Sequence, residues 1–231
     1  MYEYLADNFA NVEKEIVCAC EKAGRNRGDV RLIAVTKTHP VQLAQAVIDL
    51  GRADLGENRP HEIVEKTPLL SGNFTMHLIG QLQSNKVRKV IGLAKYIHSV
   101  DSVKLLEKID VVGEELGIAT NILVQVNTSG EESKSGCTIE EAYNLCAASA
   151  EKKYTKFCGL MTIGPLTDDV FLIEKSFESL AEIGEKAASF CENKKCELSM
   201  GMSGDFALAI KHGATMVRIG TRLVGARNYD A

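Results

Sequence analysis

The chain has 231 residues, of which 45% are hydrophobic and 25% are charged, and its formal net charge is −4. This is an ordinary globular composition with enough apolar material for one sizeable core. The slightly acidic balance and the lack of a basic tract argue against nucleic acid as the main partner.

Short apolar runs alternate with amphipathic helical segments along the chain. A helical pattern over Tyr2–Ala23 comes first. The predicted strands are the apolar runs Arg31–Thr36, Ala53–Gly56, Met76–Ile79, Tyr96–Val100, Asn121–Val126, Phe157–Met161, Glu197–Met200 and Thr215–Ile219. The predicted helices between them are Val41–Leu50, Pro60–Glu65, Ser84–Leu93, Ser102–Leu116, Ile139–Glu151, Asp169–Cys191 and Phe206–His212.

Strands that alternate with helices predict crossover connections and a parallel sheet. Eight such strands match an α/β fold, the (β/α)8 TIM barrel, which takes about 250 residues. An open doubly wound sheet is the alternative, but the first turn, Lys37–Pro40, lacks the glycines of a dinucleotide-binding fingerprint. Because no linker interrupts the pattern, we expect residues 1–231 to form a single domain, with Tyr2–Ala23 as an extra N-terminal helix outside the barrel.

Lys37 is the most informative residue of this pattern. It follows the first strand directly, and active sites of TIM barrels lie at the C-terminal ends of the strands. Burial there would lower the pKa of the lysine and free its amine to form a Schiff base. The alternative is an ordinary solvated surface lysine.

Two glycine-bearing loops, Ser199–Asp205 and Arg218–Arg222, follow the last two strands. Barrel enzymes often hold phosphate between these two loops and a helix N-terminus. Ser203 either caps the next helix or donates its hydroxyl to the phosphate, and the glycines either admit an anion or only turn the chain. A reactive amine that faces a phosphate site is the arrangement that pyridoxal 5′-phosphate (PLP) requires, so the sequence predicts this cofactor.

Arg218 lies in an otherwise apolar strand. A buried guanidinium needs an acceptor, which is either a core carboxylate or, with PLP bound, the pyridine nitrogen. An arginine at that nitrogen disfavours ring protonation. The ring is then a poorer electron sink, which favours storage or simple proton transfer over transamination.

Other polar residues rank lower as site candidates. Asn58 could bind a ring oxygen of the cofactor or merely cap a helix, and His77 is expected to be a satisfied core histidine. Lys134 lies on a loop, 127–136, that is long enough to be a lid. No Cys/His cluster has metal-ligand spacing, so no metal is predicted.

Seven scattered cysteines without a CxxC motif favour a reducing compartment. The N-terminus lacks the basic start and apolar run of a signal peptide, and no apolar stretch approaches membrane-spanning length. We therefore expect a cytoplasmic protein with no membrane partner.

Several segments in fixed order resemble the pyridoxal phosphate homeostasis protein family, single-domain PLP-binding barrels related to the N-terminal domain of alanine racemase. The resemblance covers nearly the whole chain. The segments that carry it are Ala34–Thr38, Leu55–Arg59, His77–Lys86, Val126–Asn127, Ser133–Gly136, Gly159–Ile163, Leu198–Ser203 and Val217–Thr221.

The resemblance implies a set of cofactor-binding residues and no catalytic ones. It implies that Lys37 carries PLP as a Schiff base and that Arg218 faces the pyridine nitrogen. The residues implied to hold the phosphate are Ser203, Gly220 and Thr221, and those implied to line the ring are Asn58 and Met200.

Three functions stay open. The favoured one is a PLP-binding protein of intracellular vitamin B6 homeostasis with little or no catalysis of its own. The alternative is a PLP-dependent amino-acid racemase with weak activity, and racemization needs a second base. In related racemases that base is a tyrosine from a further C-terminal domain. We expect no such domain, because the chain ends soon after Gly220, and no tyrosine, Tyr229 included, is expected at a strand mouth.

The third function is a cofactor-free lyase or aldolase that uses Lys37 on a sugar phosphate, and it would leave Arg218 unexplained. With the favoured function, the expected partners are PLP and PLP-accepting apoenzymes, and the expected state is a monomer.

Overall fold

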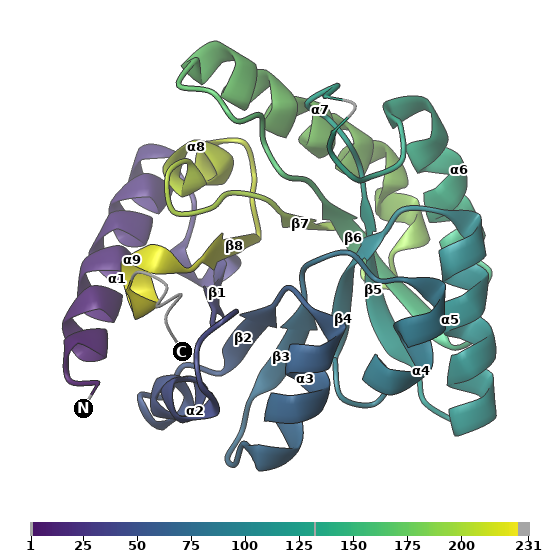
Figure 1. Cartoon of the computed structure of the whole chain (residues 1–231). Coiled ribbons are helices and arrows are strands. Elements are labelled where there is room, and N and C mark those ends of the chain that lie inside the picture. Colours follow the sequence, from purple (N-terminus) through teal and green to yellow (C-terminus); the bar gives the residue numbers. More distant parts are fainter. Residues whose placement is uncertain (1, 132, 226–231) are drawn as a thin grey trace.

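The computed structural model describes residues 2–131 and 133–225, and its strands form a closed barrel (Figure 1). All neighbouring strands are parallel, and the last strand pairs with the first. The strands are β1 Arg31–Val35, β2 Asp54–Glu57, β3 Thr75–Leu78, β4 Tyr96–Val100, β5 Thr120–Gln125, β6 Thr155–Met161, β7 Glu197–Ser199 and β8 Met216–Ile219. The predicted (β/α)8 barrel is confirmed, and the open doubly wound sheet is excluded.

The helices cover the outside of the barrel. They are α1 Tyr4–Lys22, α2 Val41–Asp49, α3 Pro60–Lys66, α4 Val87–Val90, α5 Val103–Leu116, α6 Ile139–Ala150, α7 Val170–Ala187, α8 Phe206–Lys211 and α9 Thr221–Val224. The predicted helix Ser84–Leu93 is only partly helical, because a 3-10 turn at Ser84–Lys86 precedes α4 and the chain turns extended at Ile91. No helix in the described ranges is both long and apolar enough to cross a bilayer.

The buried apolar side chains form two clusters, one outside the barrel strands and one inside them. A large core lies between the strands and the surrounding helices. A second, small cluster consists of Ile33, Leu123, Met161 and Met216, one residue each from β1, β5, β6 and β8. Because side chains alternate along a strand, residues two positions further along, such as Val35 and Arg218, belong to the next layer toward the C-terminal mouth of the barrel.

The N-terminal helix α1 packs beside the last two helices of the chain (Figure 1). The Tyr4 hydroxyl donates to the Val224 carbonyl at 3.1 Å, and Asn8 Nδ2 donates to the Leu223 carbonyl at 2.9 Å. Arg222 on α9 pairs with Glu15 on α1 at 2.9 Å. The predicted extra helix is therefore present, and it fixes α9 from outside the barrel.

Candidate cofactor site

One cavity of about 550 Å³ lies at the C-terminal ends of the barrel strands. This volume is within the usual range for small-molecule sites. Six of the seven residues predicted for the site line it: Lys37, Asn58, Ser203, Arg218, Gly220 and Thr221. Residues from β1, β8 and the loops after β2 and β7 thus meet at one place, as expected for a barrel active site.

Lys37 continues the inward-facing side of β1. Val35 and Lys37 both line the cavity, and they are two positions apart, which is the period of a strand. Lys37 is partly buried. The next residue, Thr38, has a φ of +63°, a left-handed conformation that is uncommon for a residue other than glycine. The direction of β1 therefore places Lys37 at the cavity, and the backbone changes direction at the next residue.

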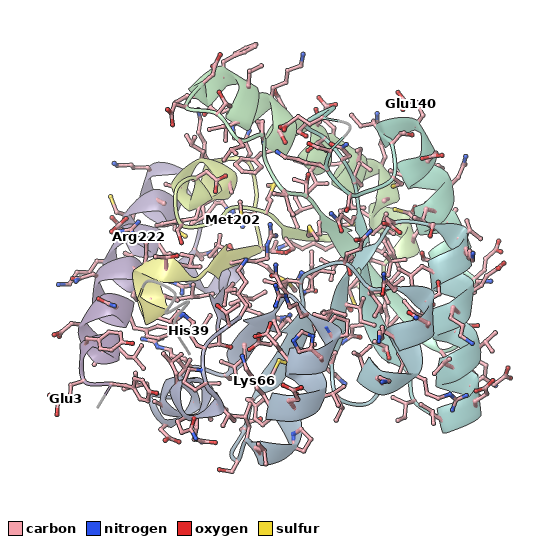
Figure 2. The ribbon with its side chains drawn as sticks, in the orientation of Figure 1. Glu3, His39, Lys66, Glu140, Met202 and Arg222 are labelled. Atoms are coloured by element: carbon pink, nitrogen blue, oxygen red, sulfur yellow. The ribbon has the colours of Figure 1, made fainter. Side chains whose placement is uncertain are left out.

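A buried ionic cluster lies behind the Lys37 segment. Lys66 on α3 donates to the Thr36 carbonyl at 3.0 Å, to Glu57 Oε1 at 2.9 Å and to Glu62 Oε1 at 3.2 Å. The Thr38 N–H donates to the same oxygen of Glu62 at 2.6 Å. Thr36 is thus held by Glu57 of β2 and Lys66 of α3, and Thr38 by Glu62 of α3. Figure 2 labels Lys66 in this cluster.

The loop after β7 presents unused hydrogen-bond donors to the cavity. Asp205, not Ser203, occupies the N-cap position of α8, and its side chain makes no capping hydrogen bond to the helix. Asp205 Oδ1 instead accepts the Met202 N–H of the loop at 2.5 Å. The Ser203 hydroxyl and the N–H groups of Ser203 and Gly204 have no hydrogen-bond partner among the described residues. These donors fit an anion such as a phosphate.

The glycines of the two loops differ in whether a side chain would fit at their positions. Gly201 has a φ of +90°, and a Cβ there would lie 2.6 Å from the Cβ of Ala209, so the fold itself requires glycine. Gly204 has open space around it, and a Cβ on Gly220 would make only an ordinary contact with Val35 at 3.5 Å. Protein packing does not require glycine at these two positions, and both leave room for a ligand to approach the backbone.

Arg218 lies on the cavity wall and is almost completely buried. Nη1 donates to the Ser199 hydroxyl at 2.7 Å, and Nη2 donates to the Thr162 carbonyl at 2.8 Å. Burial lowers the pKa of the guanidinium to about 10, and the Asp205 charge opposes this shift. Arg218 is therefore protonated at neutral pH, and no carboxylate of a described residue forms an ion pair with it. The predicted alternative of a core ion pair is not realised.

The other two ring-lining predictions have different outcomes. Asn58 lines the cavity, and it is not a helix cap, because Arg59 occupies the cap position of α3. Met200 does not line the cavity. It is fully buried in the outer core, whereas Ser199 before it faces the barrel interior and bonds His98 and Arg218. Met202 lines the cavity instead.

Two further polar features of the cavity wall were not assigned from the sequence. Gln125, on β5, is buried and donates to the Ser135 carbonyl at 3.0 Å. Lys134, left open above, lines the cavity, and its Nζ donates to the Gly164 carbonyl at 2.6 Å. The signal for Gln125 was its position as the one polar residue in the apolar run 122–126. Ser133, Lys134 and Ser135 of loop 127–136 thus line the site.

His77 has the structural role predicted for it. It is fully buried, and its two ring nitrogens lie 2.9 Å from Asp54 Oδ1 and 2.9 Å from His98 Nε2. Within the described residues, no group of three or more His, Cys, Asp or Glu side chains is arranged to hold a metal ion.

The sequence profile for the N-terminal domain of alanine racemase matches residues 10–228. The pyridoxal phosphate homeostasis protein of Haemophilus influenzae is 36% identical over 227 residues, which cover 96% of each chain. The chain belongs to the pyridoxal phosphate homeostasis protein family. The predicted resemblance is thereby confirmed over nearly the full length.

Two solved structures agree with this membership. The crystal structure of an unknown protein from Bifidobacterium adolescentis has a TM-score of 0.91 and 39% identity, covering 96% of this chain and 95% of that one. The structure of PipY from Synechococcus elongatus PCC7942 with PLP bound has a TM-score of 0.81 and 31% identity, covering 96% of this chain and all of PipY.

Proposed function

We propose that this protein binds PLP as a Schiff base on Lys37 and takes part in intracellular PLP homeostasis, with little or no catalysis of its own. The observation that carries the proposal is the joint placement of a lysine amine, a charged arginine and unused backbone donors on one cavity. The PLP-bound structure of the PipY relative supports the same cofactor.

The residues present fit the functional groups of PLP. When bound, PLP supplies an aldehyde for imine formation and a pyridine ring that draws electrons from the imine. Lys37 offers the amine, and Ser203, Gly204, Gly220 and Thr221 form a neutral, donor-rich cradle for phosphate. Arg218 offers a permanent charge to the pyridine nitrogen, which keeps that nitrogen unprotonated and weakens carbanion chemistry.

Amino-acid racemization is the alternative function. It needs an acid–base group on each face of the substrate. Among the described residues no tyrosine lines the cavity, and Tyr229 lies outside them. This lining supports a carrier over a racemase.

Visible absorption tests the proposal. Adding PLP to the purified protein should produce a yellow imine band, and the loaded protein should not convert L-alanine to D-alanine above the rate of free PLP. Rapid racemization would favour the alternative function. A protein that stays colourless and takes up no PLP would contradict the proposal and favour an aldolase that uses Lys37 directly.

The proposal extends to partners and location. PLP-accepting apoenzymes are the proposed recipients of the cofactor, and the proposed state is a monomer. All seven cysteines are free thiols in the structure, which supports a reducing, cytoplasmic setting. Analytical ultracentrifugation would test the monomer, and PLP transfer to an apoenzyme would test delivery.

A further inference from the structure

A chain of hydrogen bonds crosses the barrel interior from the N-terminal mouth to Arg218. Asp54 Oδ1 lies 2.9 Å from His77 Nε2, and His77 Nδ1 lies 2.9 Å from His98 Nε2. His98 Nδ1 lies 2.9 Å from the Ser199 hydroxyl, which accepts from Arg218 at 2.7 Å. Four strands, β2, β3, β4 and β7, therefore contribute one residue each to a path that ends at β8.

The middle of this hydrogen-bond chain is buried. His77, His98 and Ser199 are fully buried, whereas the Asp54 side chain is 22% exposed at the start of β2. Burial lowers the pKa of His77 even though Asp54 opposes that shift, and burial lowers the pKa of His98 well below its usual value. Both imidazoles are therefore neutral at neutral pH, and each has one N–H.

Only one arrangement of protons satisfies every bond of the chain. A carboxylate at Asp54 can only accept, so His77 donates from Nε2 and accepts at Nδ1. His98 then donates from Nε2 and accepts at Nδ1 from the Ser199 hydroxyl. Ser199 keeps its lone pairs for Arg218, which can only donate. All four hydrogen bonds thus point the same way, from the guanidinium to the carboxylate.

The Asp54 end of this hydrogen-bond chain is also held in place. Tyr96 stacks on His77 with ring centroids 4.8 Å apart and planes inclined by 10°. Arg31 lies 3.9 Å from Asp54 Oδ1 and 3.5 Å from Glu197. These contacts fix the positions of the Asp54 carboxylate and the His77 imidazole.

We propose that Asp54, His77, His98 and Ser199 are positioning residues that orient the Arg218 guanidinium toward the cofactor cavity. The reason lies in what Arg218 lacks: no carboxylate of a described residue forms an ion pair with it. Its nearest side-chain acceptor is the Ser199 hydroxyl, whose direction is set by the histidines and finally by Asp54. The charge of Arg218 is thereby left for a ligand in the cavity. Its effect on PLP rests on the proposed function, whereas the order of the protons does not.

The first experiment uses the protein without PLP. Long-range 1H–15N spectra of histidine-labelled protein at pH 7.5 should show His77 and His98 as neutral rings protonated at Nε2. A charged ring, or a proton on Nδ1 of either residue, would overturn the proposal. The result does not depend on PLP binding, so it stands even if the proposed function fails.

The second experiment breaks the chain at its two ends in the PLP-loaded protein. Ser199→Ala removes the acceptor of Arg218, and we expect about ten-fold weaker PLP binding. The pH at which the imine band titrates should also shift. Ser99→Ala is the matched control, because Ser99 is a buried serine on β4 whose hydroxyl has no partner among the described residues. A Ser199→Ala protein with unchanged affinity and imine titration would overturn the proposal.

Asp54 gives the sharper test, because it does not line the cavity and its side chain is partly exposed. Asp54→Leu removes the last acceptor, so the imine titration should shift in the same direction as in Ser199→Ala. The Nε2 protonation of the histidines should also be lost. Asp54→Asn keeps an acceptor oxygen for His77, and it should retain the histidine tautomers of the wild type. If Asp54→Leu left the spectrum of bound PLP unchanged, the hydrogen-bond chain would have no influence on Arg218, and the proposal would be overturned.

Discussion

Lys66 and Glu57 form a buried ion pair of 2.9 Å directly behind the segment that carries Lys37. The same ammonium binds the Thr36 carbonyl, so the pair and the strand end are held together. Burial raises the pKa of Glu57, and Lys66 opposes the shift both by its charge and by its hydrogen bond. One oxygen of Glu57 and one of Glu62 have no hydrogen-bond partner among the described residues, so the cluster depends strongly on its one lysine.

Lys66→Met should lower the free energy of unfolding by about 3–5 kcal/mol, because it leaves two buried carboxylates without their cation. Urea unfolding followed by circular dichroism measures this loss. Lys89→Met is the control, since Lys89 is exposed on α4, and it should change stability by less than about 0.5 kcal/mol. A loss below about 1 kcal/mol in Lys66→Met would show that the carboxylates are solvated or protonated in the native state.

Ser203→Ala should weaken PLP binding roughly ten-fold, because it removes a hydroxyl that lines the cavity and has no hydrogen-bond partner in the described part of the chain. Pyridoxal, which lacks the phosphate, should bind the variant and the wild type equally. Equilibrium titrations with both ligands make this comparison, and pyridoxal serves as the internal control. Equal losses for both ligands would place Ser203 away from the phosphate.

Acid should destabilise the protein through its two buried histidines. Their folded-state pKa values lie below the usual 6.5 because of burial, so the unfolded chain binds more protons than the folded one below that pH. The stability they contribute is complete above about pH 6.5 and is lost as the pH falls toward the folded-state values. Between pH 7.5 and 5.5 we expect a loss of roughly 1 kcal/mol for each histidine.

Urea midpoints measured at several pH values test this dependence. His98→Leu should flatten the curve between pH 7.5 and 5.5, although its absolute stability is lower. His61→Gln changes an exposed histidine on α3 and should leave the curve as it is in the wild type. If the wild-type protein were equally stable at pH 7.5 and pH 5.5, the rings of His77 and His98 would have to be protonated in the folded state at pH 5.5.

The repeating units of the fold could be predicted from the sequence because they follow local patterns. Each strand lies within a residue or two of its predicted range, and the capping box of Thr138 and Glu141 at the start of α6 marks a boundary that side-chain chemistry alone specifies. The helix α9 was missed because it is a single turn, held by contacts from Tyr4 and Asn8 on α1. Contacts between residues so far apart in the chain produce no local pattern in the sequence.

The site was less predictable than the fold. Lys37 and Arg218 stand out because each is a charged residue at the end of, or inside, an apolar run. Met200 was expected to line the ring but lies in the outer core, because Ser199 before it faces the barrel interior. The path from Asp54 to Arg218 joins residues more than a hundred positions apart, and only the closed barrel brings them together.

Borohydride reduction of the PLP-loaded protein, followed by mass spectrometric mapping, tests the central claim most directly. The phosphopyridoxyl group should be found on the peptide that contains Lys37, and Lys37→Ala should remain folded and acquire no label there. Lys134→Ala is the matched comparison, because Lys134 also lines the cavity, and it should still be labelled at Lys37. Stoichiometric label on a different lysine of the wild type would contradict the account.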